Sequence, residues 1–423
     1  MQMRSVLVAA GFVAAVALAH TPAPLPSGGL EELHAWVSVT FNYSGSPWGE
    51  TEADAVRAGA FIKENNVITG IAVWGDDIFV TVPRWRAGVP STLNKVDNSS
   101  GRPMLVPWPS WEFNTHTVKY VQSARVDQTT GIMFVIDAGR TNFFDPDAKT
   151  HFNGPAQILM LNATTGSILY RHVFPDAIFP YNSSFLNDVV FDMGNTVAYM
   201  TDTNVAGNGA LVSHNWTSGF SFRFESASTR ADPTYMVRVL NVSYPLVNSP
   251  VDGIALCLQR QRLYYSPVEG ARMFSLDAFA LSAPTATHDS VLATVNLEET
   301  KRSFSDGLLT PPQLPPYTFG AIDRIWYGSN ADAELRLYTS RYGVNPTDVL
   351  IARDVEKLQW VDTLCFVPFP GPAGQGAYQD GWVYFTTNRL QLFFFHTMDF
   401  HGGQGNNMRV FRVPTTYLPT GNA

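Results

Sequence analysis

The sequence has only two cysteines, Cys257 and Cys365, among 423 residues. Two thiols cannot form a disulfide-dense scaffold or a cysteine-rich zinc site, so burial of apolar side chains has to stabilise the fold. Each cysteine lies inside a separate apolar run, which favours two buried free thiols over one disulfide bridge. Apolar residues make up 45% of the chain, enough for a large core.

Charge is also scarce. Charged residues make up 15% of the chain, the net charge is -8, and neither sign forms a block. Because phosphate recognition needs clustered Lys and Arg, we expect no nucleic-acid partner. After the first residues, no charge-free apolar run reaches the length of about 20 residues that spans a bilayer, so we expect no membrane span.

Enzyme signatures are missing as well. The sequence has no GxSxG nucleophile elbow, no HExxH motif and no Walker loop. The nine histidines lack metal-ligand spacing, and DPDAKTHFNG (Asp145 to Gly154) places Lys149 where a calcium loop needs an oxygen ligand. We therefore predict no bound metal and no cofactor, and motifs identify no catalytic residue.

The N-terminus has the pattern of a secretory signal peptide over residues 1–19. Arg4 precedes an apolar run from Val6 to Leu18, and small residues at Ala17 and Ala19 predict cleavage before His20. We therefore expect a secreted, extracellular protein. Chance occurrence is the alternative for the six Asn-x-Ser/Thr sequons, but the signal peptide favours glycosylation at Asn42, Asn98, Asn162, Asn182, Asn215 and Asn241.

One phrase recurs along the chain: an apolar strand, a tight polar turn, and a second strand that ends in a polar residue. Such runs, rich in Val, Ile, Phe and Tyr without sustained helical periodicity, predict an all-β fold. The copies are Thr69 to Val82, Ser123 to Gly139, Asn187 to Asp202, Asp252 to Pro267, Gly320 to Ser329, and a divergent one, Val361 to Leu390.

We interpret each copy as the two inner strands of a four-stranded sheet. The spacing, about 55 to 70 residues except for the last step, leaves room for outer strands such as AQILMLNA (Ala156 to Ala163) and SILYRHVF (Ser167 to Phe174). The sequence thus predicts one six-bladed β-propeller domain over residues 20–423. A β-sandwich is the alternative, but it should not repeat one phrase at this spacing.

Several segments resemble the yellow and major royal jelly protein family. ENNVITGIAVWGDDIFVTVPRWRAGVPSTLNKV and PMLVPWPSWEFN are similar to the family's first blade, and FVIDAGR, PAQILMLNATTG and FLNDVVFD to its next two. DGIALCLQRQRLYYSPV, AIDRIWYG and TTNRLQLFFFHTMDF match later blades in order, so the resemblance spans roughly residues 34–413. Thr130 and Gly154 stand about where relatives carry cysteines, so this chain resembles a divergent member.

Propeller geometry brings the entrances of successive inner strands to one end of the central channel, where polar side chains can surround a small ligand. The residues that open the phrases are Asn187, Asp188, Asp252 and Asp362. Beside them we place Glu112, Asn114, Asp137, Arg140, Asn388 and Arg389. Aromatic side chains for stacking or cation–π contact are Trp111, Phe113, Phe185 and Tyr327. Structural roles at strand ends are the alternative for each.

Three functions remain open. The family resemblance implies either a secreted protein that binds a small ligand such as a biogenic amine, or a dopachrome-converting enzyme of melanin formation. The enzyme would need a base, Glu112 or Asp188, and a donor, Arg140 or Arg389. Other six-bladed propellers suggest a calcium-dependent lactonase, with Asn187, Asp252 and Glu112 as ligands. We favour the first function, and the sequence does not predict the oligomeric state.

Overall fold

The computed structural model of the chain describes residues 29–142, 144, 152–204, 208–246, 248–311, 322–341, 344–369 and 380–417. The predicted signal peptide and most of the DPDAKTHFNG string lie outside these residues, as does the start of the fifth phrase.

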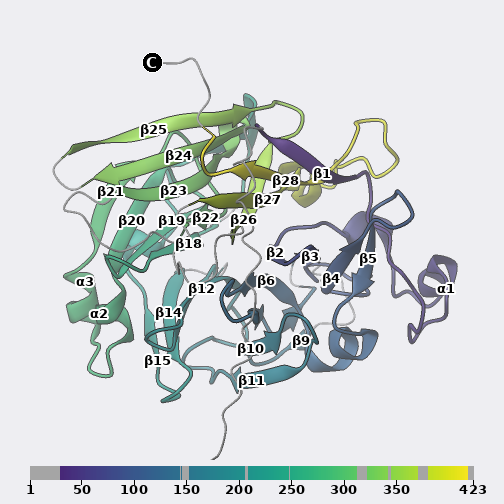
Figure 1. Cartoon of the computed structure of the whole chain (residues 1–423), viewed down its shortest axis with the longest axis horizontal. Coiled ribbons are helices and arrows are strands. Elements are labelled where there is room, and N and C mark those ends of the chain that lie inside the picture. The colour runs from purple at the N-terminus through teal and green to yellow at the C-terminus, as the bar shows by residue number, and fades with distance from the viewer. Residues whose placement is uncertain are drawn as a thin grey trace, which may run out of the picture.

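Six four-stranded antiparallel sheets surround a common centre, as Figure 1 shows. In order from the innermost strand, the first three blades are β2 (Ile71–Trp74), β3 (Asp77–Thr81), β4 (Leu93–Asp97), β5 (Met104–Pro107); β6 (Val121–Val126), β7 (Ile132–Asp137), β10 (Gln157–Asn162), β11 (Ile168–Val173); and β12 (Leu186–Asp192), β13 (Val197–Asp202), β14 (Ala210–Asn215), β15 (Ser221–Phe224). The next two are β18 (Val251–Cys257), β19 (Arg262–Pro267), β20 (Arg272–Asp277), β21 (Asn296–Thr300); and β22 (Leu308–Leu309), β23 (Ile322–Ser329), β24 (Glu334–Arg341), β25 (Val344–Arg353).

The sixth blade joins the two ends of the described chain. It consists of β26 (Trp360–Pro368), β27 (Gly381–Asn388), β28 (Met408–Pro414) and, outermost, β1 (Glu31–Trp36). Strand β1 pairs antiparallel with β28, from Glu31 opposite Arg412 to Trp36 opposite Met408. Figure 1 shows the two strands side by side although they are far apart in sequence. This pairing ties the N-terminal part of the wheel to its last sheet, which helps to close the ring.

Smaller elements decorate the wheel. Two-stranded ribbons pair β8 (Arg140–Thr141) with β9 (Phe152–Asn153) and β16 (Val237–Val239) with β17 (Val242–Tyr244). In the described residues, α-helix is confined to α1 (Glu52–Arg57), α2 (Ala278–Ser282), α3 (His288–Leu292) and α4 (Leu390–Phe394). Short 3-10 turns cover Lys63–Asn65, Ala227–Thr229 and Asn330–Asp332, and one π turn covers Phe113–Thr117. No helix in these ranges has the length and apolar character needed to cross a membrane.

Burial explains why the inner strands are nearly continuous apolar runs. Every residue of β18 is buried, whereas the outermost strand β11 exposes most of its residues. Inner strands have a neighbouring blade on each face and so cannot alternate between core and solvent. Aromatic rings fill the space between blades: Phe134 of β7 stacks on Phe191 of β12 with ring centroids 4.3 Å apart. The apolar contacts between blades therefore supply much of the core.

The predicted six-bladed β-propeller is confirmed, and the sandwich alternative is excluded. Five of the six phrases hold the two inner strands of a blade, and the predicted outer strands of the second blade correspond to β10 and β11. The fifth phrase was assigned wrongly. Its Gly320 to Ser329 segment contains β23, the second strand, while the innermost strand β22 is only two residues long and lies upstream. A two-residue strand is too short to produce a periodic signal.

Buried threonines link neighbouring blades. Thr81 of β3 donates to the backbone oxygen of Gln122 in the next blade at 2.6 Å, and Thr203 donates to that of Val251 at 2.7 Å. Thr386 of β27 donates in the same way to the oxygen of Thr69, across the junction between the sixth and first blades. These side chains satisfy carbonyl groups that face the interface between blades.

Replacing Thr81 by Val should therefore destabilise the wheel at almost constant side-chain volume. The change leaves the Gln122 oxygen and the Gly70 N–H, which donates to Thr81 Oγ1 at 2.8 Å, without a partner. We expect a loss of about 1–3 kcal/mol in the free energy of unfolding, measured by denaturant titration. Thr129→Val, at an exposed turn, is the matched control. Equal unfolding midpoints for both variants would contradict this role.

Candidate functional site: buried carboxyl groups at the propeller axis

Four aspartates converge where the innermost strands of consecutive blades begin. Asp188 lies on β12, Asp252 on β18, and Asp362 on β26, while Asp306 lies two residues before β22. Each exposes at most 9% of its surface. Four carboxyl groups so far from water are costly unless they are paired, hydrogen-bonded or protonated.

Glycines let these strands approach closely. Gly253 follows Asp252, and a Cβ atom at Gly253 would lie 2.1 Å from the backbone oxygen of Asp306. Likewise, a Cβ atom at Gly307 would lie 2.1 Å from the backbone oxygen of Asp362. Because any side chain at either position would clash with the next blade, the Asp-Gly pairs bring successive carboxyl groups together.

Asp188 is the paired member of the group. It forms an ion pair with Arg125 of β6, with 2.9 Å between Nη2 and Oδ2, and it accepts a hydrogen bond from Ser123 at 2.9 Å. Arg125 also donates from Nη1 to the backbone oxygen of Leu364 at 2.7 Å. Arg125 therefore neutralises one carboxylate and crosses the axis from the second blade to the sixth.

The other three carboxyl groups have mainly uncharged partners. Asn187 donates from its side-chain amide to Asp252, and it also contacts Thr203 at 2.9 Å. The indole of Trp360 donates to Asp306 at 2.6 Å. Among the described residues, Asp362 accepts hydrogen bonds from Asn388 at 2.8 Å and from Thr363 at 3.1 Å.

Burial and nearby carboxylates raise the pKa values of these three groups. Burial is the larger cause for Asp252 and Asp362, whose pKa values lie well above the usual range, and the nearby Asp306 carboxylate adds to both. The pKa of Asp306 rises to about 6, again mainly because of burial. Asp252 and Asp362 therefore hold their protons to a higher pH than an exposed aspartate does, and Asp306 ionises near pH 6.

The carboxyl groups border a cavity of about 50 Å³ at this end of the axis. Asp252, Asp306 and Asp362 contribute to its wall together with Gln122, Asn187 and Thr203. Aromatic side chains complete it: Trp85, Phe144, Phe185, Trp360 and Phe394. Among the described lining residues there is no Lys or Arg, so the wall is anionic and aromatic.

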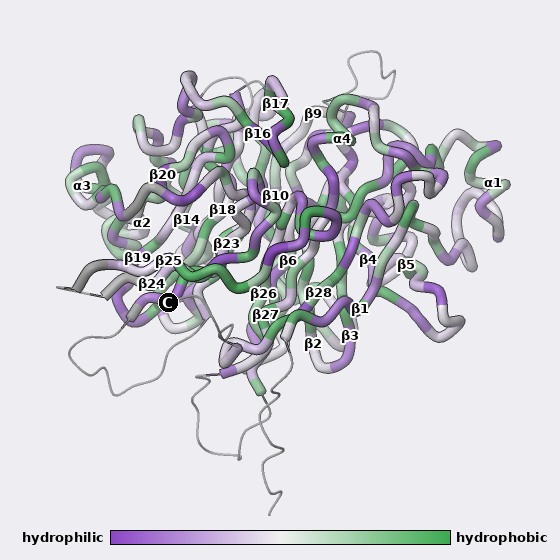
Figure 2. Tube along the Cα trace, turned by 90° about the horizontal axis from the view of Figure 1, so that it is seen from above, coloured by the Kyte–Doolittle hydropathy of each residue, from purple (hydrophilic) through white to green (hydrophobic). Residues whose placement is uncertain are grey.

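The cavity lies on the face that carries α4 and the β16–β17 ribbon. Leu390 and Phe394 of α4 line it, as does Leu246, two residues after β17. Figure 2 shows α4, β16 and β17 together on one face, with the turn between β2 and β3 on the opposite face. The predicted mouth is therefore on the side where each innermost strand begins.

Some of the predicted ligand-binding residues lie at this cavity. Asn187, Asp252, Asp362 and Phe185 line it directly. Asp188 and Asn388 stand behind it, the first bound to Arg125 and the second to Asp362. Arg140 is buried nearby, where it donates to the backbone oxygen of Ser184 at 2.7 Å.

Two predicted residues hold backbone turns instead. The side chain of Asn114 accepts hydrogen bonds from the N–H groups of Thr92 and Leu93 and donates to three carbonyl oxygens. Asp137 accepts from the backbone N–H groups of Lys119, Tyr120 and Gly139 and from the Gln157 amide. Their hydrogen-bonding capacity is thus largely used by the fold.

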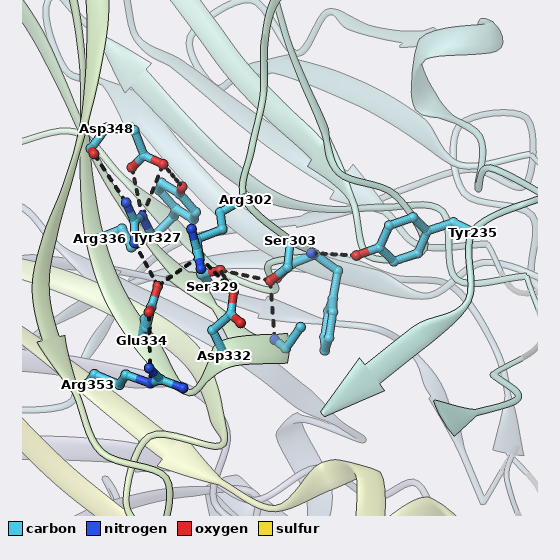
Figure 3. A network of polar contacts seen from close by, with 12 residues as sticks. Tyr235, Arg302, Ser303, Tyr327, Ser329, Asp332, Glu334, Arg336, Asp348 and Arg353 are labelled. Carbon is cyan, nitrogen blue, oxygen red and sulfur yellow. Dashed lines mark hydrogen bonds and ion pairs between the residues drawn. The ribbon is translucent and has the colours of Figure 1, made fainter. Parts of the chain in front are cut away.

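Others lie away from the cavity. Glu112 is exposed beside Trp111, which stacks on Tyr43, and neither Glu112 nor Phe113 lines the cavity. Arg389 donates to the backbone oxygen of Gln404 at 2.7 Å. Tyr327 of β23 donates to Asp348 at 2.9 Å within the network of charged residues shown in Figure 3. The calcium set of Asn187, Asp252 and Glu112 is therefore not assembled.

Sequence reasoning missed Asp306, together with Trp360, which binds it. The signal was present: Ser305-Asp306-Gly307 followed by Leu308 and Leu309 matches Val251-Asp252-Gly253 followed by an apolar run. Placing the fifth blade's first strand too late hid this Asp-Gly pair.

The described residues show no arrangement typical of a metal site or of a reactive cysteine. They contain no cluster of three His, Cys, Asp or Glu side chains arranged to hold a metal ion. Cys257 and Cys365 are both buried and are not joined by a disulfide bond, as expected. Burial raises the pKa of both thiols to about 12, which disfavours the reactive thiolate.

These features define a class of protein: a six-bladed β-propeller with a buried group of carboxyl and aromatic side chains at one end of its axis. A family model described as "Major royal jelly protein" matches residues 121–418, more than half of the chain. The chain belongs to the yellow and major royal jelly protein family. The match begins at the second blade, whereas the resemblance was predicted from residue 34.

Individual relatives agree with this assignment. Protein yellow of Drosophila erecta is 27% identical over 290 residues, which are 64% of this chain and 51% of that protein. Protein yellow of Drosophila guanche is 28% identical over 292 residues, 64% of this chain and 49% of that protein. The chain spans about half the length of these relatives.

Similar solved structures include a regucalcin from Agrobacterium tumefaciens, with a TM-score of 0.45 and 11% identity over 84% of this chain and 92% of that one. A luciferin-regenerating enzyme has a TM-score of 0.44 and 13% identity over 86% of this chain and 94% of that one. Likeness at this level says nothing about the chemistry of the site.

The raised pKa of Asp306 predicts a stability effect with a definite sign. Its folded pKa of about 6 exceeds the ordinary aspartate value of 3.8, so between these pH values the folded state binds more protons than the unfolded state and loses stability as pH rises. Asp306→Asn removes this loss. Relative to wild type, the variant should gain about 2–3 kcal/mol in unfolding free energy between pH 4 and pH 7.

Denaturant titrations at both pH values measure this change. The control is Asp76→Asn, at an exposed position in the turn between β2 and β3, which should not alter the pH dependence. If Asp306→Asn follows the wild-type pH dependence, the Asp306 carboxyl group does not carry the raised pKa.

Proposed function

We propose that the chain is a secreted binding protein for a small organic cation. The cation enters the cavity lined by Asp252, Asp306 and Asp362, called here the carboxyl-lined cavity, with its ammonium group toward Asp252 and Asp306. The observation that carries this proposal is the wall of three carboxyl groups and five aromatic rings without a Lys or Arg among the described lining residues. Carboxylates pair with an ammonium group, and aromatic faces attract the same charge.

The protonation state makes the site responsive to charge. A cation near Asp252 or Asp362 favours the ionised carboxylate, so binding should release protons from groups that burial keeps protonated. Asp306 supplies a negative charge near neutral pH, and a bound cation would favour further ionisation at Asp252 or Asp362. An anionic or uncharged ligand would gain nothing from this ionisation.

The cavity size defines how such a ligand would be held. A space of about 50 Å³ accepts an ammonium group and its first methylene groups, but not a whole aromatic amine. The rest of the ligand would occupy the mouth, where Leu246 and Phe394 are only half buried. Binding of a larger amine therefore requires these two side chains to move.

Calorimetry with serotonin or dopamine in buffers of different ionisation enthalpy tests the proposal. We expect binding that survives a chelator, releases protons at pH 7, and strengthens as pH rises from 5.5 to 7.5. Asp252→Asn should weaken binding about 10–100-fold, because a charge-assisted hydrogen bond is lost. Asp76→Asn should bind as wild type does.

Binding without proton release, or an Asp252→Asn variant with unchanged affinity, would overturn the proposed role of the carboxyl groups. No heat with any amine would remove the proposal altogether.

A second candidate function is proton-transfer catalysis, such as dopachrome conversion. The observation that favours it is the pairing of Asp252, whose pKa burial raises well above the usual range, with Asp306, whose pKa is about 6. Two adjacent carboxyl groups in different protonation states can act as general acid and general base. A dopachrome decolorisation rate equal to that in buffer alone, or unchanged in Asp306→Asn, would eliminate this candidate.

Secretion and glycosylation belong to the same proposal. None of the six sequon asparagines is buried: Asn98, Asn182 and Asn241 are exposed, and the other three are half-buried. We expect the full chain, expressed in insect cells, to appear in the medium and to lose mass on treatment with peptide-N-glycosidase. Retention inside the cells with unchanged mass would contradict this expectation.

A further inference from the structure

A second cavity lies at the opposite end of the axis. It has a volume of about 350 Å³, and residues of all six innermost strands or the turns that follow them line it. The carboxyl-lined cavity contacts the beginnings of these strands, such as Asn187 and Asp252, whereas this one contacts their later residues, such as Val190 and Ile254. We call it the apolar cavity. It opens toward the face of the turn between β2 and β3, which lies opposite α4 in Figure 2.

Its wall is mostly hydrocarbon. All six blades present apolar side chains there, and the sixth contributes Cys365 and Phe366 of β26. The aliphatic members are Val73, Val126, Val190, Ile254, Ala255, Leu256, Leu258, Leu308 and Leu309. A volume above about 300 Å³ falls in the range of small-molecule sites. An apolar molecule would gain free energy simply by leaving water for this space.

Two polar atoms in the same wall have no hydrogen-bond partner in the described part of the chain. Arg125 and Thr310 both line the cavity and are about nine-tenths buried. Arg125 Nε and Thr310 Oγ1 find no partner among the described residues. A buried polar atom without a partner costs about 1–3 kcal/mol, so an oxygen atom of a ligand that meets them would recover that cost.

The charges around the cavity indicate whether the ligand's oxygen belongs to an anionic or an uncharged group. The guanidinium of Arg125 is already neutralised by Asp188 at 2.9 Å, and the cavity's other charged groups are the carboxylates of Asp127 and Asp192. Both of these accept hydrogen bonds within their own turns, from Thr130 and Asn195. An anionic ligand would face a net negative surrounding, so an uncharged acceptor fits best.

We propose that the apolar cavity is a second ligand site, for an uncharged apolar molecule that carries a carbonyl oxygen, and that Arg125 Nε donates to that oxygen. The Arg125–Asp188 ion pair separates this site from the carboxyl-lined cavity. One end of the axis therefore binds an organic cation, and the other end binds an uncharged apolar molecule.

The neutral naphthyl ketone dye Prodan, whose fluorescence depends on its surroundings, tests the proposal with the full mature chain. We expect saturable binding with a blue-shifted emission. Acetylnaphthalene should displace the dye about tenfold better than ethylnaphthalene, which lacks the oxygen, and also better than the anion naphthoate. Equal displacement by ketone and hydrocarbon would overturn the role of Arg125, and absence of saturable binding would overturn the site.

Two variants locate the dye. Val190→Phe places a ring in the apolar cavity and should weaken Prodan binding at least tenfold, while Asp252→Asn, at the other end, should leave it unchanged. The reverse pattern, or loss in neither variant, would contradict the assignment. Denaturant titration of each variant confirms that it is folded, and Leu256→Trp repeats the test from another blade. Failure of amine binding would leave these outcomes unaffected.

Discussion

Crowding of buried carboxyl groups where the inner strands begin is the constraint that governs the axis of this propeller. A ring of blades forces the first residues of successive inner strands together, and Gly253 and Gly307 remove the side chains that would hold the strands apart. Asp252, Asp306 and Asp362 then lie too close, and too far from water, for all three to stay ionised. Carboxyl groups at this end of the axis thus retain protons that a bound cation would displace.

The ion pair between Arg125 and Asp188 gives the axis its polarity. On one side of the pair lie the carboxyl groups and their amide and hydroxyl partners; on the other, the wall is mostly hydrocarbon. Both residues occupy inner strands of neighbouring blades, so the partition is built from the same strands that form the channel. An arginine buried to this degree costs less when it neutralises a carboxylate, which is the reason that the two are found together.

The sequence allowed the architecture to be predicted because the hairpin phrases repeat the same physical requirement: each pair of inner strands is buried on both faces. It also identified Asn187, Asp252 and Asp362, since polar residues at the start of an apolar run have few other places to go than the mouth of the channel. Strand β22 was not predicted, because two residues show no periodicity, and Asp306 just before it was missed for the same reason.

The other differences have a different cause. Asn114, Asp137 and Tyr327 have the residue types of a binding site, yet their partners are turn amides and, for Tyr327, the carboxylate of Asp348. Which polar residue binds the fold and which one faces the cavity depends on contacts between segments distant in sequence, and residue type and spacing alone do not contain that information. The apolar cavity could not be predicted from the sequence either, because most of its wall consists of apolar residues that are typical of any core.

The most direct measurement is a carbon-13 NMR titration of the aspartate carboxyl groups, with the axial signals assigned by Asp252→Asn, Asp306→Asn and Asp362→Asn. We predict that Asp306 titrates near pH 6 and that the pKa values of Asp252 and Asp362 lie well above the usual range of an aspartate. Titration of all three near pH 4 would show that the axis holds ordinary solvated carboxylates, and the central claim would fail.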